Sequence, residues 1–287
     1  MNARAARSTS CLASPDNADS LAKEHIMRSL SIASTGMLAQ QLNVETISNN
    51  IANMNTTAFK RQRAEFQDLL YQNQRRAGAA SSDANTIVPA GIQIGLGVKA
   101  AAVYRITEQG NLTTTGNTLD VAMQGKGWFQ VELPSGETAY SRAGSFQLSA
   151  EGKIVTADGY TVKGGGTIPR DATDVTVNTS GEVLVKQPSQ TQVQRVGQFE
   201  LAGFANDAGL EGLGDNLFKN TPASGDPVTG TAGRQGFGTV LQGFLETSNV
   251  NTVQEVTNLI TAQRAYEMNS KVIQASDEMM SALNQLR

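Results

Sequence analysis

The residue types that most often carry out enzyme chemistry are scarce in this 287-residue chain. Cys11 and His25 are its only cysteine and its only histidine, and both lie close to the N-terminus. A single cysteine cannot form a disulfide within one chain, and one Cys with one His is too few for a Cys/His zinc site. The rest of the protein also lacks the histidine that a Ser-His or Cys-His nucleophile needs. We therefore expect no enzyme activity, no catalytic residue, no cofactor and no metal site.

Carboxylates are the remaining candidates, because a pair of them roughly 5–10 Å apart can hydrolyse a glycoside without histidine. The candidates considered all lie in the predicted β-region: Asp120, Glu132, Glu137, Glu151 and Asp158. Most adjoin Gly or Ser in predicted turns, where acidic residues are common. An extracellular carbohydrate-active β-protein is therefore only an alternative hypothesis.

Gly125-Lys126-Gly127 resembles a phosphate-binding loop only superficially. It lacks the spacing of such a loop and precedes a predicted strand, so no helix N-terminus would face a phosphate. The one basic cluster, Lys60 to Arg63 with Arg75 and Arg76, comes without aromatic stacking residues or a groove-reading motif. With a net charge of −3, the chain is not expected to bind nucleic acid. The sequence contains no run of 18 or more apolar residues, so no transmembrane helix is predicted.

The most regular pattern in the sequence lies between Ser29 and Lys60. Apolar residues alternate at spacings of three and four, which places them on one narrow seam of a helix. Asn and Thr side chains should end this helix near Asn53 to Thr57. The seam comprises Leu30, Ala33, Met37, Gln40, Val44, Ile47, Ile51 and Met54.

The C-terminal segment repeats the pattern. Thr252 to Arg287 contains neither Pro nor Gly, and Thr252 with Glu255 fits a capping box at the helix start. Polar residues in the two seams can fix the register of a helix and its choice of partner. An intramolecular helical hairpin is the alternative to assembly with neighbouring molecules. This second seam comprises Leu259, Ala262, Tyr266, Asn269, Ile273, Ser276, Met280 and Leu283.

The centre of the chain has a different composition. Of the 28 glycines, 26 lie between Gly91 and Gly243, and short strand-like runs alternate with Gly-containing turns. Three hairpins are predicted, beginning at Trp128, Phe146 and Val175. We thus predict an α+β fold in which long N- and C-terminal helices pack as a coiled-coil-like pair around a central β-rich sandwich or irregular barrel.

Five segments follow from these patterns. Residues 1–26 are polar and aperiodic, and are expected to be a disordered extension or the product of a start codon assigned too far upstream. The others are an N-terminal helix over 27–56, an extended linking segment over 57–99, a β-rich outer domain over 100–243 and a C-terminal helix over 244–287.

Several motifs resemble those of the bacterial flagellar rod and hook protein family. Ser48-Asn49-Asn50-Ile51-Ala52-Asn53, continuing to Phe59-Lys60, is similar to the N-terminal signature of that family. Leu245 to Asn251 and Gln263 to Asn269 are similar to its C-terminal signature. The matched motif residues are Asn50, Ala52, Asn53, Phe59, Lys60, Asn249, Asn251, Gln263, Arg264, Ala265, Tyr266 and Glu267.

The similarity covers Met27 to Arg287, with two departures. Ala58 stands where the family usually has Gly, and Ser31 stands where a Trp is often found. The segments that look most like those of distal rod subunits are Arg61 to Ala64, Asp68 to Tyr71, Gly91 to Gly97, Gln109 to Leu112 and Leu119 to Ala122. A proximal rod or hook subunit is the alternative within the family.

The resemblance implies a structural protein of the flagellar basal body, exported by the flagellar type III apparatus. It implies self-assembly into a helical tube, the distal part of the rod that joins the motor to the hook. The implied partners are proximal rod proteins, the hook protein and the basal-body rings. Together with the helix pattern, it predicts an assembly interface of Leu30, Met37, Val44, Ile47, Ile51, Met54, Phe59, Leu259, Tyr266, Ile273, Met280 and Leu283.

Overall fold

The computed structural model describes residues 15–75, 78, 90–188, 192–234 and 236–285. The chain divides into two units, each built from segments distant in the sequence. The helical unit comprises the chain up to Glu45, Ala64–Val103 and the residues from Asn258 onward. The β unit comprises Thr46–Arg63 and Tyr104–Thr257.

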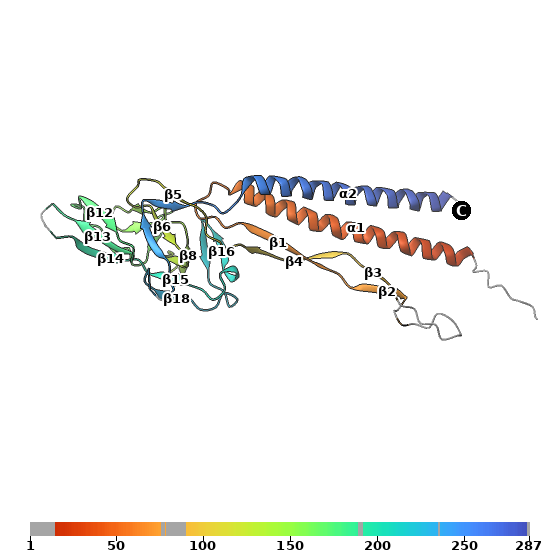
Figure 1. Ribbon diagram of the computed structural model, residues 1–287, viewed down its shortest axis with the longest axis horizontal. Helices are drawn as coiled ribbons and strands as arrows, with labels where there is room; N and C mark the ends of the chain where they lie inside the picture. Colours follow the sequence, from red (N-terminus) through yellow and green to blue (C-terminus); the bar gives the residue numbers. More distant parts are fainter. Residues whose placement is uncertain (1–14, 76–77, 79–89, 189–191, 235, 286–287) are drawn as a thin grey trace, which may run out of the picture. The chain divides into compact units, whose positions relative to one another are not determined.

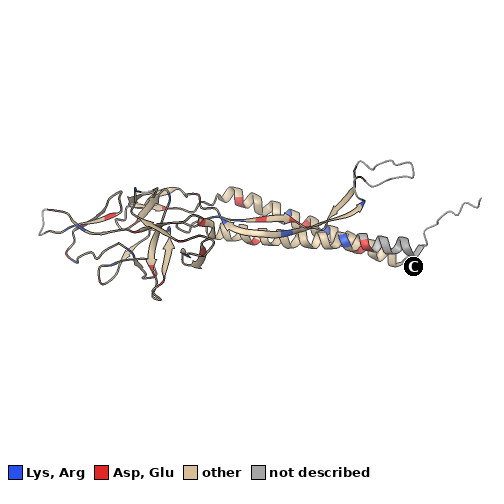
Figure 2. Cartoon of the chain, turned by 90° about the horizontal axis from the view of Figure 1, so that it is seen from below, with Lys and Arg blue, Asp and Glu red and all other residues tan. Residues whose placement is uncertain are grey.

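Two long helices dominate the helical unit, and they lie side by side in both views (Figures 1 and 2). Helix α1 spans Pro15–Ala52, so it begins before the predicted start at Met27, and residues 1–14 lie outside the described residues. It ends where predicted, because Asn53 Nδ2 donates to the Asn49 carbonyl at 3.0 Å and Thr56 Oγ1 donates to Asn53 Oδ1 at 3.1 Å. Over the described residues, no helix combines the length and the apolar character that crossing a membrane requires.

Helix α2 spans Thr252–Gln285 and begins at the predicted residue. The predicted capping box is wrong, since Asn251 caps the helix by accepting a hydrogen bond from the Gln254 N–H at 3.2 Å. The Glu255 carboxylate is turned elsewhere, toward Asn50 and Arg61.

A two-stranded ribbon completes the helical unit. Strand β1 (Gln62–Asp68) pairs with β4 (Val98–Arg105), and β2 (Tyr71–Arg75) pairs antiparallel with β3 (Ile92–Gly95). Phe66 therefore lies in strand β1. Gly97, with φ of +123°, packs against Thr35 of α1, and the Val98 N–H lies 3.4 Å from Thr35 Oγ1.

The β unit holds the remaining strands (Figure 1). They are β5 (Leu112–Thr114), β6 (Val121–Gln124), β7 (Trp128–Glu132), β8 (Thr138–Ser141), β9 (Gln147–Leu148), β10 (Ile154–Val155), β11 (Thr161–Val162), β12 (Asp174–Val177), β13 (Glu182–Lys186), β14 (Gln194–Gln198), β15 (Leu201–Gly203), β16 (Glu211–Gly214), β17 (Leu217–Lys219), β18 (Val228–Gly230), β19 (Thr239–Gln242) and β20 (Phe244–Glu246), with a 3₁₀ turn at Asp207–Gly209.

The three predicted hairpins are present as β7–β8, β9–β10 and β12–β13. The largest sheet runs in the order β16-β17-β8-β7-β11-β10-β9, and off this path β15 pairs with β7 and β18 pairs with β15. Within the described part of the chain the sheet does not return on itself, so the predicted irregular barrel is not formed and the strands make open sheets. The core packs Phe129 edge-on against Phe146 and Phe199, at ring-centroid distances of 5.3 and 5.8 Å.

Candidate functional site

A buried polar junction in the β unit brings together motif residues from both ends of the chain. Asn50, near the end of α1, is 1% exposed. Its side-chain amide binds the backbone of Gln62 twice, with Nδ2 donating to the carbonyl and Oδ1 accepting from the N–H, both at 2.8 Å. Asn50 Nδ2 also lies 3.2 Å from Glu255 Oε2, so this one amide joins α1, β1 and the first turn of α2.

Lys60 and Glu246 form the ion pair at the centre of this junction. Their side chains are almost fully buried, and the Lys60 ammonium donates to the Glu246 carboxylate and to the Glu108 carbonyl. The Gly110 N–H donates to the same carboxylate at 2.9 Å. Burial lowers the pKa of Lys60, and the Glu246 charge partly opposes that shift.

Arg142 reaches the other side of Glu246. Its Nε lies 3.4 Å from Glu246 Oε2, and its terminal nitrogens donate to the carbonyls of Gly125 and Gly127 at 2.6–2.8 Å. The Lys126 carbonyl accepts from the Gly238 N–H. The Gly125-Lys126-Gly127 motif is thus a loop whose carbonyls hold a buried guanidinium.

The side-chain amide of Asn249 forms hydrogen bonds with the backbone of two other segments. Its Oδ1 accepts from the Arg61 N–H at 2.7 Å, and its Nδ2 donates to the carbonyls of Ile106 and Glu108 at 2.9 and 3.0 Å. An amide that donates and accepts in this way fixes the position of two loops at once.

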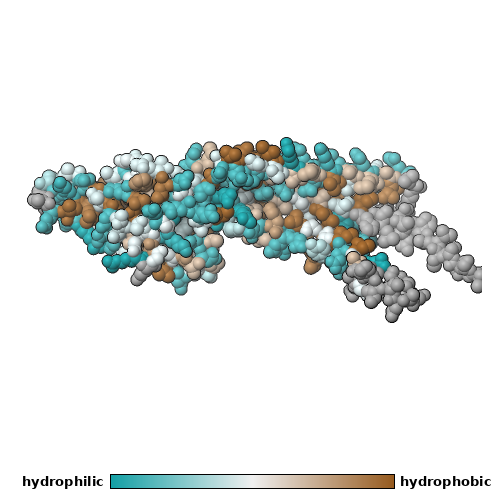
Figure 3. Space-filling model, in the orientation of Figure 1, coloured by the Kyte–Doolittle hydropathy of each residue, from teal (hydrophilic) through white to brown (hydrophobic). Residues whose placement is uncertain are grey.

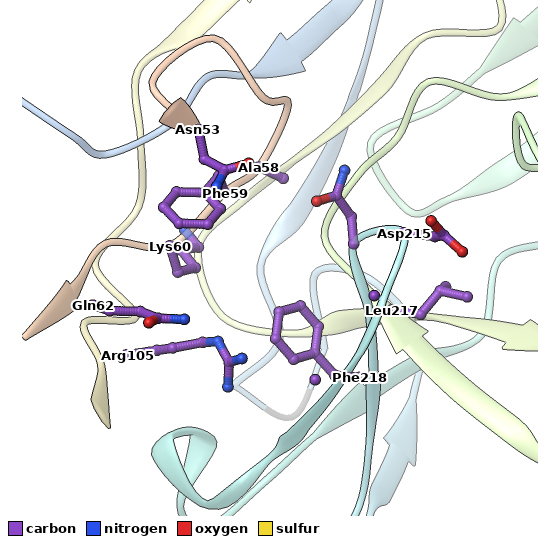
Figure 4. Close-up of a pocket in the computed structure, with 12 residues that line it drawn as sticks. Asn53, Ala58, Phe59, Lys60, Gln62, Arg105, Asp215, Leu217 and Phe218 are labelled. Atoms are coloured by element: carbon purple, nitrogen blue, oxygen red, sulfur yellow. The ribbon is translucent and has the colours of Figure 1, made fainter. Parts of the chain in front are cut away.

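Ala58 lies at the turn between α1 and β1 with φ of +56°, in the left-handed region that favours glycine. The turn borders a cleft of about 200 Å³. Figure 4 shows Phe59 and Lys60 on one side of this cleft and Leu217 and Phe218 on the other. The hairpin that supplies the second side turns through Asp215 and Asn216, both with positive φ, as a type I′ turn requires.

In the helical unit, small and polar residues mediate the contact of α1 with α2. The hydroxyls of Ser29 and Ser276 lie 3.1 Å apart, and Asn269 packs over Gly36, where an added Cβ would lie 2.8 Å from Asn269 Nδ2. Moving one heptad forward on α1 moves the contact one heptad back on α2, so the helices run antiparallel here. Asn269 and Ser276, the polar residues of the predicted second seam, are therefore the residues that contact α1.

The apolar residues predicted as an assembly interface differ in how far the chain buries them. Ile47 is buried, whereas Met54 and Tyr266 are 39% and 44% exposed. The others are half-buried: Leu30, Met37, Val44, Ile51, Phe59, Leu259, Ile273, Met280 and Leu283.

An open groove of about 530 Å³ lies between the helices of this unit. Val44 and Tyr266, one residue from each predicted seam, line it together. Its other lining residues are polar or acidic: Gln41, Glu45, Gln263 and Glu267.

Ten of the twelve family-motif residues fall into two groups. Asn50, Lys60 and Asn249 meet in the polar junction, while Asn53 and Asn251 cap helix ends. The second group lies on α2 in the helical unit, where Ala265 is half-buried and Gln263, Arg264, Tyr266 and Glu267 are exposed. Phe59 borders the cleft, and Ala52 is exposed at the end of α1.

Sequence reasoning missed Glu246, Glu255 and Arg142 as members of the junction. Glu246 lies inside a recognised motif, and a carboxylate in an apolar strand is a signal that it needs a buried cation. No pattern distinguishes Arg142 from any other arginine.

Three family models match separate parts of the chain. A flagella basal body rod protein model matches residues 30–60, and a flagellar hook protein FlgE/F/G D1 domain model matches residues 122–185. A flagellar basal body rod FlgEFG protein C-terminal model matches residues 241–286. The first and third matches include all three motif residues of the junction.

Full-length relatives are similar over most of the chain. A flagellar basal-body rod protein FlgG of Caulobacter vibrioides is 60% identical over 261 residues, which cover 91% of this chain and 100% of the relative. The FlgG of Agrobacterium fabrum is 55% identical over 90% of this chain and 98% of its own length. The FlgG of Buchnera aphidicola subsp. Schizaphis graminum is 48% identical over 90% of this chain and 99% of its own length.

Proposed function

Because this chain belongs to the family of flagellar basal-body rod proteins named FlgG, it is a structural subunit of the flagellar distal rod, and we propose that its two long helices build the inner wall of a helical tube. The observation that carries this proposal is the incomplete burial of the helices. Residues such as Met37, Val44 and Ile273 are apolar and recur at heptad spacing, yet a single chain leaves them half-buried.

Neighbouring copies would complete that burial. A subunit that meets its neighbours through non-identical faces forms an open helical polymer, which is the form a shaft requires. Fully burying one such side chain contributes about 1.5–3 kcal/mol. We therefore propose the twelve apolar residues named above as the assembly interface, with α1 and α2 as a coiled-coil-like pair whose polar contacts set its register.

The remaining assignments of this proposal follow the family. The segment over 57–99 makes subunit contacts that stiffen the shaft, and the β-rich segment over 100–243 forms the outer layer. The partners are proximal rod proteins, the hook protein and the basal-body rings. The chain is exported by the flagellar type III export apparatus. The protein acts as a structural part and not as an enzyme.

A deletion strain tests the rod assignment. Electron microscopy of basal bodies from this strain should show assembly stopping after the proximal rod, and the wild-type chain should restore the hook. Assembly that stops at an earlier or later stage would assign the chain to a proximal rod or hook position. Glycan hydrolysis by the purified chain would favour the carbohydrate-active alternative.

One substitution tests the helix assignment in the same strain. Ile273→Asp places a charge on the half-buried edge of α2 and should prevent assembly while the β unit stays folded. Gln274→Asp is the matched control, because Gln274 is the exposed neighbour on the same helix. Normal swimming of the Ile273→Asp strain would argue against the assembly interface.

A further inference from the structure

The cleft between the turn after α1 and the β16–β17 hairpin contains an arginine without a counter-ion (Figure 4). Arg105 is half-buried, and its guanidinium forms no ion pair with any carboxylate of the described residues. Its hydrogen bond to the Leu210 carbonyl is long, at 3.4 Å from Nη1. Burial lowers the pKa of Arg105, and no described carboxylate opposes that shift as Glu246 does for Arg142. A positive charge is thus partly removed from water without a partner.

An aromatic ring and a glycine hold this guanidinium in place. Its central carbon lies over the buried Phe218 ring, 5.2 Å from the ring centroid. Gly212 of β16 leaves the space that the guanidinium occupies, since an added Cβ there would lie 2.6 Å from Arg105 Nη2. A guanidinium stacked on an aromatic face keeps its N–H groups in one plane, where a carboxylate can accept from two of them.

Gln62 supplies a second donor beside Arg105. The Ile106 N–H donates to the Arg61 carbonyl at 2.8 Å, which places Gln62 and Arg105, the next residue on each strand, side by side. Figure 4 shows both side chains pointing into the cleft. The Asn50 amide fixes the backbone of Gln62 from the polar junction. The half-buried side-chain amide of Gln62 makes no hydrogen bond with the described residues, so it is available to a ligand.

The other lining residues favour a ligand with a single negative charge. The cleft has a volume of about 200 Å³, and Phe59 and Leu217 give it apolar walls. The Lys60 ammonium also lines it but is paired with Glu246. The exposed carboxylate of Asp215 lies on the opposite side, and Figure 4 shows it turned away from the guanidinium. A carboxylate therefore suits the cleft better than a dianion such as phosphate.

Strand β16 adds backbone groups beside this anion-binding position. It is the edge strand of the largest sheet, and all four of its residues are exposed. An edge strand offers N–H and C=O groups with which an extended peptide can pair. Gly212 and Gly214 line the cleft and carry no side chain that would keep such a peptide away. The face of the β unit seen in Figure 3 is mainly hydrophilic between small apolar patches, so polar contacts of this kind must select the ligand.

We propose that this cleft binds an acidic side chain of an extended segment in a partner protein, with Arg105 and Gln62 donating to the carboxylate and β16 pairing with the backbone. The partner segment needs a Glu or Asp between residues that favour a strand, because side chains alternate between the two faces of an extended chain. All residues of the cleft belong to the β unit, so the site is separate from the helix contacts proposed for rod assembly.

Two peptides that differ in one group test the site on the full-length chain. Fluorescence anisotropy compares Thr-Val-Glu-Val-Thr, amidated and labelled with rhodamine at its N-terminus, with the same peptide carrying Gln in place of Glu. The Glu peptide should bind about fivefold or more tightly, because hydrogen bonds to a charged group are stronger than those to a neutral amide. This preference should decrease as salt is added. Equal affinity of the two peptides for the wild-type chain would overturn the proposal.

Two substitutions then assign the preference to the cleft. Arg105→Gln should abolish it, and Gly212→Ala should weaken it, because the added Cβ displaces a guanidinium that keeps its charge. Arg170→Gln is the matched control, since Arg170 is exposed in the β unit and does not line the cleft. The fluorescence of Trp128 during urea unfolding shows whether each variant is folded, and Gly212→Ala decides where Arg105→Gln is not. A preference for Glu that persists in the folded cleft variants, or that Arg170→Gln also removes, contradicts the site.

Competition separates the other possible occupants. If acetate or inorganic phosphate displaces the labelled Glu peptide at the same concentration as unlabelled Glu peptide does, the cleft binds a free anion and the peptide assignment is wrong. If the affinity for the peptide falls as the concentration of the chain is raised, a second copy occupies the cleft and the assignment to a partner protein is wrong. None of these results changes the expected phenotype of the deletion strain, so the rod assignment is tested separately.

Discussion

Ala58 holds a backbone conformation that an L-residue adopts at a cost. Its φ of +56° lies in the left-handed region, and its N–H donates to the Glu246 carbonyl at 2.8 Å, so the turn cannot relax without losing that bond. The left-handed conformation costs a non-glycine residue about 1–2 kcal/mol, and glycine loses about 0.5–1 kcal/mol of this advantage through its more flexible unfolded state. Ala58→Gly should therefore raise the free energy of unfolding of the β unit by about 0.5–1 kcal/mol.

Urea unfolding followed by the fluorescence of Trp128, the only tryptophan, measures this change. Ala122→Gly is the control, because Ala122 is buried in β6 and is not among the residues with positive φ, so glycine should destabilise it. Equal destabilisation by the two substitutions would show that the turn at Ala58 carries no strain.

Lys60 should matter more than any exposed charge of the β unit. Lys60→Met removes one partner from a buried ion pair and leaves the Glu246 carboxylate with Arg142 and the Gly110 N–H, which costs about 3–5 kcal/mol. The same Trp128 fluorescence assay measures the loss. Lys153→Met is the comparison, since the ion pair of Lys153 with Glu151 is exposed and should contribute under about 1 kcal/mol.

The lowered pKa of Lys60 also predicts a pH dependence. In the unfolded chain the group titrates near 10.5, so the unfolded state holds the proton more tightly than the folded state does. Burial of the charged Lys60 ammonium therefore lowers the free energy of unfolding by its full amount below the folded pKa. This loss becomes smaller as the pH rises toward 10.5. Relative to Lys60→Arg, whose guanidinium does not titrate in this range, the wild-type free energy of unfolding should rise with pH. A fall over this interval would mean that Glu246 outweighs burial.

Among the elements, the ribbon of the helical unit depends on one close approach. Gly97 has φ of +123°, and a Cβ there would overlap Thr35 Oγ1 on α1. Gly97→Ala should therefore lift the ribbon from α1 and speed hydrogen exchange of the Leu69 and Leu96 amides, whose bonds to the Gly97 and Leu70 carbonyls flank the glycine, by about tenfold or more. Gly95→Ala is the control, since its Cβ would meet Tyr71 at an ordinary 3.5 Å, and exchange as slow in Gly97→Ala as in Gly95→Ala would contradict the strain.

Regular elements could be predicted from the sequence because their signals are local. Heptad spacing predicted both helices, and Asn and Thr side chains predicted where α1 ends. Gly-containing turns predicted the three hairpins. The capping box failed because a long-range contact competed for the same side chain, since Glu255 bonds with Asn50 instead of capping its own helix.

The contact face of the helices was predictable only in part, for a related reason. Periodicity gives the apolar stripe of a helix, but α1 also contacts α2 through small and polar side chains, at Ser29, Gly36 and Ser276. Periodicity does not show these contacts. Family motifs marked Lys60 as a residue of interest but did not predict the polar junction, because Lys60, Glu246 and Arg142 are far apart in the sequence and no spacing rule joins them.

At the scale of the whole molecule, the two units differ in how much they bury. The β unit has a core of large aromatic and aliphatic side chains that includes Phe129, Phe146 and Leu201. In the described part of the helical unit, the buried apolar residues are Ile26 and three alanines, Ala33, Ala39 and Ala262. Since helices in proteins are stabilised mainly by packing of an apolar face, the helical unit should be the less stable of the two when the chain is alone.

Hydrogen exchange on dilute, unassembled chain measures this difference directly. Amides of α1 from Ile32 to Val44 should exchange much faster than those of Phe129 to Val131 in β7, because local opening of the helical unit exposes little apolar surface. Assembly should slow exchange in α1 and leave β7 unchanged, since neighbouring copies bury Met37, Val44 and the residues beside them. The Ile273→Asp variant, which we expect to remain unassembled, supplies the monomer control at the same concentration. Equal protection of α1 and β7 in the dilute chain would mean that the helix pair is stable without neighbouring copies. The half-buried apolar residues would then not need a second copy to stabilise the helices.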